Sequence, residues 1–117
     1  SADELRNVGV SALVSGLLLT SADGAAARSI VAEVERAALA RLLTERTLSQ
    51  AALASGGAAD KERDILETWG SWYDGALAAA ADIEVGGSSP DTRTAIEAAR
   101  ERVRAAVQSH LAALAPR

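Results

Sequence analysis

Three aromatic side chains and one charged pair carry most of the chemistry that this sequence offers. Trp69, Trp72 and Tyr73 are the only aromatic residues, and they lie close together in the chain. The pair Glu45-Arg46 interrupts a segment rich in alanine and leucine. A guanidinium binds planar anions through parallel hydrogen bonds, whereas indole N–H and phenol O–H groups bind polar ligands. Arg46, Trp69 and Tyr73 are therefore the candidate ligand-binding residues.

The same residues also have a purely structural interpretation. Trp69 and Tyr73, one helical turn apart, would fill space that an alanine-rich core leaves open. Glu45 would pair with Arg41, four residues earlier on the helix, in a contact worth roughly 0.3 kcal/mol. The functional alternative places Arg46 inside a helical bundle, where its guanidinium would face an anion.

Residue types needed for catalysis or metal binding are scarce. The chain has no cysteine and a single histidine, His110, which excludes disulfides, thiolate sites and a typical zinc site. His110 is either a boundary residue beside the apolar stripe of the last helix, or a ligand contact or pH sensor. We therefore expect no catalytic residue, no metal and no cofactor in this domain.

Charge and hydropathy exclude two further classes of protein. The net charge of −4 argues against nucleic-acid binding, which needs clustered lysine and arginine. Most other arginines alternate with glutamates, a pattern typical of solvated helix faces. They are Arg28, Arg36, Arg63, Arg93, Arg100, Arg102 and Arg104. No uninterrupted apolar run approaches the roughly 20 residues that a membrane-spanning helix needs.

Apolar residues at three- and four-residue spacing predict four helices. These helices are expected over residues 3–19, 25–54, 59–83 and 90–116, with a break at 20–24. Ser55-Gly56-Gly57 would end the second helix with a glycine C-cap, and Ser89-Pro90 would start the fourth. Short loops place successive helices antiparallel. The sequence thus predicts an all-α fold, a single domain over residues 1–117 that forms an up-down-up-down four-helix bundle.

Each predicted helix carries an apolar stripe. On the first helix it is Leu5, Val8, Ala12, Leu13 and Leu17. On the second helix the stripe is Val31, Val34, Ala38, Leu42 and Glu45, with Leu39, Leu43, Arg46 and Leu53 on an adjacent face. On the third helix it is Ile65, Leu66, Trp69, Trp72, Tyr73, Ala76, Ala80 and Ile83. On the fourth helix it is Ile96, Ala99, Val103, Val107, Leu111 and Leu114.

The segment from Leu42 to Gly57 has a recognisable pattern. It contains Glu-Arg-Thr-Leu-Ser followed by Leu-Ala-Ser-Gly-Gly. This resembles the L-x-x-E-R-G-L-S … L-A-S-G-G stretch of the nitrate- and nitrite-sensing (NIT-like) domain, a helical module of actinobacterial sensor histidine kinases. Arg46 matches the arginine of the motif, and Asp74 resembles its downstream Asp-x-Ala. Thr47 replaces the motif glycine, and Gly70-Ser71 stands where a second arginine is expected.

The resemblance implies an extracytoplasmic, extracellular sensor domain of a plasma-membrane histidine kinase or related receptor. In the parent protein of such a two-component system, transmembrane helices would flank the domain on both sides. The implied ligand is a small anion or polar molecule, with Arg46 as the charge contact and Trp69 and Tyr73 lining or supporting the site. Ligand binding would shift the terminal helices, and a homodimer is the expected assembly.

Two other classes of protein compete with the sensor. A helical protein-protein interaction or dimerisation module would need no pocket, and its aromatic residues would lie at a subunit interface. A small secreted helical hairpin of the WXG type would need Trp-x-Gly in a central turn. Here Trp69-Gly70 and Trp72-Tyr73-Asp74-Gly75 miss that spacing and fall within a predicted helix.

Overall fold

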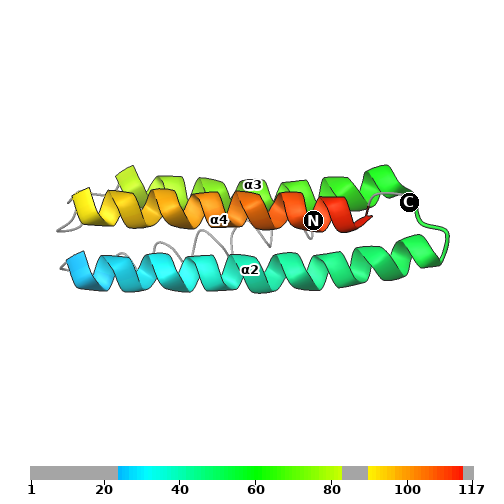
Figure 1. Cartoon of the computed structure of the whole chain (residues 1–117), viewed down its shortest axis with the longest axis horizontal. Helices are drawn as coiled ribbons and strands as arrows, with labels where there is room; N and C mark the ends of the chain where they lie inside the picture. The colour runs from blue at the N-terminus through cyan, green and yellow to red at the C-terminus, as the bar shows by residue number, and fades with distance from the viewer. Residues whose placement is uncertain (1–23, 83–89, 115–117) are drawn as a thin grey trace.

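A computed structural model describes residues 24–82 and 90–114 of the chain, which form three helices. They are α2 (Gly24–Ala54), α3 (Ala59–Asp82) and α4 (Pro90–Leu114) (Figure 1). The predicted bounds of the second, third and fourth helices differ from these by one or two residues. The predicted helix over 3–19 and the Ser89 cap lie outside the described residues.

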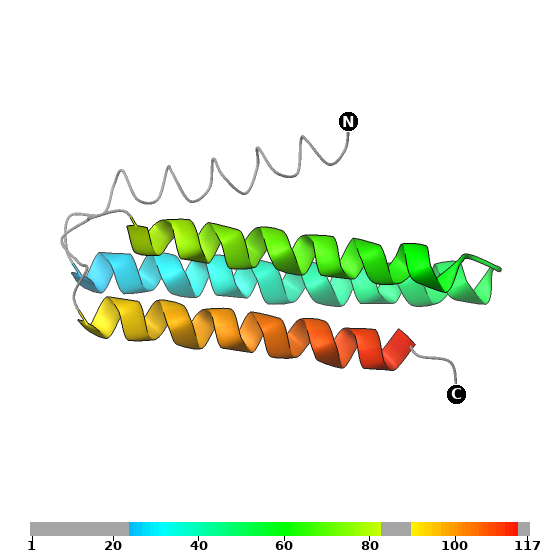
Figure 2. The same ribbon diagram turned by 90° about the horizontal axis from the view of Figure 1, so that it is seen from above.

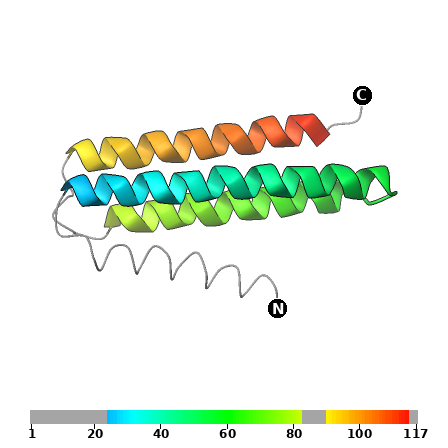
Figure 3. The same cartoon turned by 90° about the horizontal axis from the view of Figure 1, so that it is seen from below.

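Successive helices run antiparallel, as the short loops predicted (Figures 1 and 2). Each of the three helices packs against both of the others, which closes a triangular bundle (Figure 3). The all-α class is therefore confirmed, with three helices and no strand among residues 24–82 and 90–114. Within these ranges, no helix is both long and apolar enough to cross a bilayer.

The turn between α2 and α3 depends on two glycines for two different reasons. Gly56 adopts a φ of 92°, the left-handed conformation that closes a helix C-terminus. Its N–H donates to the Leu53 carbonyl at 3.1 Å, while the Gly57 N–H donates to the Ala52 carbonyl at 2.7 Å. A Cβ on Gly57 would lie only 2.7 Å from that Ala52 oxygen. This paired bonding is the Schellman motif, and it confirms the predicted C-cap.

The core runs along the axis of the bundle, and most of the predicted stripes point into it. All five residues predicted on α2 and all six on α4 are buried. On α3 the stripe is rotated slightly: Leu77 is fully buried although it was not predicted, whereas Ile65, Trp72 and Ala76 are only partly buried at the edge. Ala80 and Ile83 lack described side chains.

Gly70 allows α3 and α4 to approach closely. It is buried in the middle of α3, and a Cβ at this position would lie 2.4 Å from Val107 Cγ2 on α4. Any larger residue would therefore push the two helices apart or displace Val107. Trp69-Gly70 accordingly lies mid-helix and not in a turn.

Candidate functional site

An arginine and three aromatic rings form a compact cluster where α2 meets α3. Trp69 is buried and stacks on Tyr73 with ring centroids 5.9 Å apart. Trp72 meets the Trp69 ring edge-on at 5.2 Å. The guanidinium carbon of Arg41, on α2, lies 4.6 Å from the centre of the Trp69 ring, a cation–π contact. The cation beside the aromatic residues is therefore Arg41.

Arg41 also binds the buried carboxylate of Glu45, one turn further along α2. Their closest N–O distance is 3.6 Å, and the Glu45 side chain is only 7% exposed, compared with 43% for Arg41. The i, i+4 pair expected from the sequence is therefore present. Its carboxylate lies among core residues, where an unpaired charge would cost several kcal/mol (order of magnitude, about 3–5).

Arg46 lies five residues beyond Arg41 on α2. Its side chain is half-buried, and its Nε is shielded from solvent without a hydrogen-bond partner among the described residues. Burial of His110 on α4 lowers the pKa of its imidazole, and the positive charge of Arg46 lowers that pKa further. Arg46 and His110 are thus electrostatic neighbours across the seam between α2 and α4.

Ser49 and His110 each carry a further buried polar atom. Ser49, one turn beyond Arg46, is 1% exposed. Its Oγ and the Nδ1 of His110 have no hydrogen-bond partner among residues 24–82 and 90–114. Buried polar groups are normally hydrogen-bonded, because leaving one without a partner costs roughly 1–3 kcal/mol.

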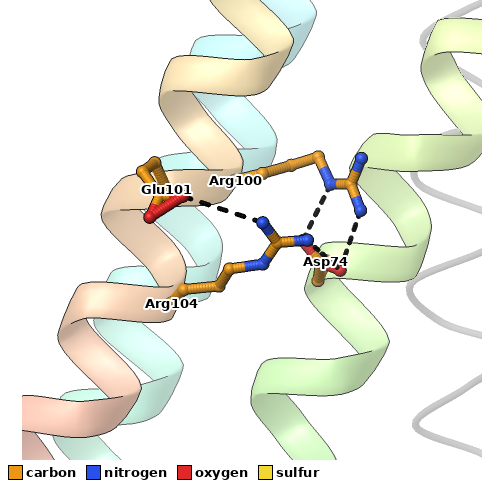
Figure 4. Close-up of polar contacts among 4 residues, drawn as sticks. All are labelled: Asp74, Arg100, Glu101 and Arg104. Carbon is orange, nitrogen blue, oxygen red and sulfur yellow. Dashed lines mark hydrogen bonds and ion pairs between the residues drawn. The ribbon is translucent and has the colours of Figure 1, made fainter.

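A second polar site joins α3 to α4 near the surface (Figure 4). Arg100 donates to Asp74 from Nε at 2.8 Å and from Nη2 at 3.1 Å, a bidentate pair. Arg104 reaches the same carboxylate at 3.3 Å and Glu101 at 3.7 Å. Hydrogen bonding by Arg100, together with both positive charges, lowers the pKa of Asp74, and Asp74 in turn raises the pKa of Arg100.

This network borders an open groove of about 220 Å³ between α3 and α4. The groove is lined by Glu67, Gly70, Ser71, Asp74, Arg104, Val107 and Gln108. Each charge of Arg104 and Asp74 is already balanced by a neighbour. The network therefore acts mainly as a clamp between α3 and α4, as bidentate arginine–carboxylate pairs do.

The structure brings together two of the three predicted ligand-binding residues. Trp69 and Tyr73 stack within the core, where they can support a site but present little surface to a ligand. Arg46 faces His110 on α4, and the guanidinium over Trp69 is that of Arg41.

Sequence reasoning missed Ser49 and the contacts that four arginines, Arg63, Arg100, Arg102 and Arg104, make between helices. Ser49 follows Glu45 by four residues, so the spacing that places Leu42 and Glu45 in the core also indicates Ser49. Arg63 and Arg100 were interpreted as parts of solvated faces, which was wrong. Both are half-buried, and both bind a neighbouring helix: Arg63 donates to the Leu111 carbonyl at 3.5 Å, and Arg100 binds Asp74.

Comparisons of this chain with protein-family models, curated protein sequences and solved structures found no match. In the described part of the chain, no group of histidine, aspartate and glutamate side chains has the arrangement of a metal site. The function is therefore argued from the polar groups themselves.

Proposed function

We propose that this chain is the extracytoplasmic sensor domain of a membrane-bound histidine kinase or related receptor, and that it binds a small anion. The Glu45-Arg46 motif and its resemblance to the NIT-like domain support the assignment to a sensor. The observation that carries the proposed ligand class is the shielded Arg46 Nε, which has no acceptor among the described residues. A buried charged donor without a partner is costly, so an anion that supplies the acceptor would gain a charge-assisted hydrogen bond.

The position of Arg46 suggests how binding would become a signal. It lies on α2, the longest described helix, at the seam with α4. An anion held there would favour one arrangement of α2 against α4 over another, and so shift the population of helix positions. Trp69 and Tyr73 would act indirectly by holding α3 against α2. In the parent receptor, such a helix shift would pass to flanking transmembrane helices.

Thermal unfolding in matched salts tests this proposal. We expect nitrate, nitrite or acetate to raise the melting temperature above that in chloride at equal ionic strength. At an anion concentration one hundred times Kd, the free energy of unfolding would rise by about 2.7 kcal/mol. Arg46→Ala should abolish the gain, whereas Arg36→Ala should retain it, because Arg36 is exposed on the same helix. Equal melting temperatures in all four salts would contradict the anion proposal.

We propose further that residues 3–19 pack as an additional helix and complete an up-down-up-down four-helix bundle. A helix of this length is about 25 Å long, so it would extend from the start of α2 to about the level of Arg41. Arg41 lies 15 residues before Gly56 and Trp72 lies 15 residues after Gly57, which puts them side by side on α2 and α3. Trp72 is half-buried at the edge of the core, and its exposed part is apolar surface that the additional helix would cover.

A pair of substitutions tests this arrangement. Leu13 belongs to the apolar stripe of residues 3–19, and Ser11 lies off that stripe. We expect Leu13→Asp to lower the melting temperature, because a packed carboxylate loses its hydration, and Ser11→Asp to leave it almost unchanged. Equal melting temperatures for the two variants would show that residues 3–19 do not pack on the bundle.

A helical dimerisation module is the second candidate function. Leu39 and Leu43 lie one turn apart on α2 and are 37% and 50% exposed. Such a pair favours contact with a second copy, in line with the expected homodimer. Sedimentation should then show a dimer that Leu43→Glu disrupts, whereas Leu48→Glu, on a different face of α2, leaves it intact. A monomer at every concentration would exclude this candidate.

A further inference from the structure

We propose that the groove between α3 and α4 binds a short linear molecule with an ammonium group at one end and a carboxylate at the other, such as an ω-amino acid. Glu67 would bind the ammonium group, and Arg104 would bind the carboxylate. Gly70 and Val107 would contact the methylene chain between them. The groove is lined by α3 and α4 alone, so this site is independent of the anion site proposed at Arg46 of α2.

The size and walls of the groove define what it can hold. Its volume is about 220 Å³. Sites for drug-sized ligands enclose roughly 300–1,000 Å³, so this groove suits a molecule of only a few heavy atoms. Its walls are residues 67, 70, 71 and 74 of α3 and residues 104, 107 and 108 of α4. These spacings place each set on one face of its helix, so the two faces enclose a single elongated groove.

The order of the residues along the groove follows from two contacts. Gly70 lies opposite Val107, because a Cβ on Gly70 would clash with the Val107 side chain. Asp74, one turn after Gly70, meets Arg104, three residues before Val107, at 3.3 Å. Glu67 precedes Gly70 by three residues, so it lies on the opposite side of Gly70 from that ion pair. Glu67 and Asp74 are therefore about 10 Å apart along the axis of α3.

Two opposite charges of the groove remain available to a ligand. Arg100 already satisfies the Asp74 carboxylate through two hydrogen bonds, at 2.8 and 3.1 Å (Figure 4). Arg104 contacts Asp74 and Glu101 at 3.3 and 3.7 Å, longer than the roughly 2.7–2.9 Å of a strong charge-assisted hydrogen bond. Its side chain is 53% exposed, so it can turn toward a ligand. Glu67 has no ion-pair partner among residues 24–82 and 90–114.

A ligand with two separated charges matches this arrangement. In an ω-amino acid a methylene chain keeps the ammonium group and the carboxylate apart, whereas in an α-amino acid both are bonded to the same carbon. The methylenes would pass over Gly70, which has no side chain, and against the apolar Val107. Ser71 and Gln108 line the same stretch, and their hydroxyl and amide groups can form further hydrogen bonds with the ligand. A ligand with a single charge would use only one end of the groove.

Nuclear magnetic resonance titration of the full chain with 4-aminobutyrate tests the proposal. We expect the backbone amide signals of Gly70, Ser71 and Gln108 to shift and reach saturation. Three compounds of similar size test each requirement at equal ionic strength: 2-aminobutyrate carries both charges on one carbon, butylamine lacks the carboxylate, and butyrate lacks the ammonium group. Because exposed ion pairs contribute little each, we expect all three to bind about two- to fivefold more weakly at the groove.

Matched variants locate the two charges. Glu67→Gln should remove the preference for 4-aminobutyrate over butyrate, and Arg104→Gln should remove the preference over butylamine. Asp64→Asn and Arg93→Gln should retain both preferences, because they remove the same charges from exposed positions outside the groove. Ser71→Leu should abolish binding by filling the groove. Since Ser71 is exposed, this variant should keep the melting temperature of the parent chain.

Three results would overturn the proposal. Equal affinities for 4-aminobutyrate and 2-aminobutyrate would mean that the groove does not recognise separated charges. Unchanged preferences in Glu67→Gln and Arg104→Gln would place the ligand elsewhere. If 4-aminobutyrate leaves the signals of Gly70, Ser71 and Gln108 unshifted, the groove is not a binding site for this class of molecule.

Discussion

The two halves of this bundle bury different kinds of side chain. In the apolar half, away from the turn between α2 and α3, the core is mainly aliphatic, although Thr92 near the start of α4 is also buried. It contains Val31, Val34 and Ala38 of α2, Leu77 of α3, and Ile96, Ala99 and Val103 of α4. In the polar half, next to that turn, Leu66 and Leu111 share the interior with Glu45, Ser49 and Glu62, and the half-buried His110 lies at its edge.

This difference suggests that the apolar half mainly stabilises the fold, whereas the polar half is where a ligand would bind. Each aliphatic side chain in the apolar half contributes burial without a polar cost, about 25 cal/mol per Å². In the polar half, buried polar groups must recover their lost hydration through partners. Glu45 has Arg41, but Ser49 Oγ and His110 Nδ1 have no partner among the described residues. Groups that lower stability in this way are expected where a ligand binds.

The largest predicted effect compares one leucine from each half. Leu77 and Leu66 are both fully buried on α3. We expect each change to alanine to lower the free energy of unfolding by about 2–5 kcal/mol, with Leu77→Ala at the upper end. Near Leu66, water can enter the cavity and bind the polar groups. Urea unfolding of the two variants measures the difference, and equal losses would mean that the halves are packed equally tightly.

A smaller loss is expected where α3 and α4 approach most closely. Gly70→Ala places a methyl group against Val107, so we expect a loss of about 1–3 kcal/mol despite the better helix propensity of alanine. Val107→Ala removes the methyl groups that would clash. The loss of unfolding free energy in the double variant should therefore be smaller than the sum of the losses in the two single variants. Simple additivity in a double-mutant cycle would contradict the close approach.

The opposite sign is predicted for Ser49→Ala in the polar half. Removing a buried hydroxyl that has no partner relieves its desolvation cost, and alanine is the better helix former. We expect the free energy of unfolding to rise by about 0.5–1 kcal/mol in chloride. Ser29→Ala serves as a control, because Ser29 is exposed on the same helix. A loss of stability in Ser49→Ala would mean that this hydroxyl has a stabilising partner.

The smallest expected effect is a pH dependence of the folding stability, caused by His110 in the polar half. The pKa of His110 is lower in the folded chain than its ordinary value of about 6.5. The unfolded chain therefore takes up the proton first, and stability falls as the pH drops below about 6.5. Asp74 acts only under more acidic conditions, because its pKa is also lowered. In His110→Gln, melting temperatures should fall less between neutral pH and about pH 5. Identical profiles for the two proteins would show that partial burial does not lower the pKa of His110.

Some features of the fold follow from local sequence alone. Three- and four-residue spacing located α2, α3 and α4, and every stripe residue that it predicted on α2 and α4 is buried, although it missed Ile30 on α2. Ser55-Gly56-Gly57 identified the turn, because only glycine adopts the backbone conformation of Gly56 without strain. The Arg41–Glu45 pair also followed, since residues four apart on a helix are neighbours whatever lies around them.

Contacts between helices could not be derived in this way. The apolar stripe on α3 suggested Ala76 and Ile83 for the core, but it omitted Leu77, because a small rotation of the helix changes which residue points inward. Asp74 resembles part of a sensor motif, but the sequence does not say which arginine on a facing helix binds it. The structure shows that this arginine is Arg100. The polar residues were affected similarly: Arg46 was identified from its motif, whereas its effect on His110 of α4 became visible only in the packed bundle.

The sequence by itself therefore determined the helices, their antiparallel order and the turn at Gly56, because these depend on periodicity and on the conformations open to neighbouring residues. Only the tertiary structure decided that Arg41 covers Trp69, that Gly70 meets Val107 and that Arg46 faces His110. The physical reason is that contacts between helices depend on the rotation and register of each helix. These are set by how whole surfaces pack, which no local pattern specifies.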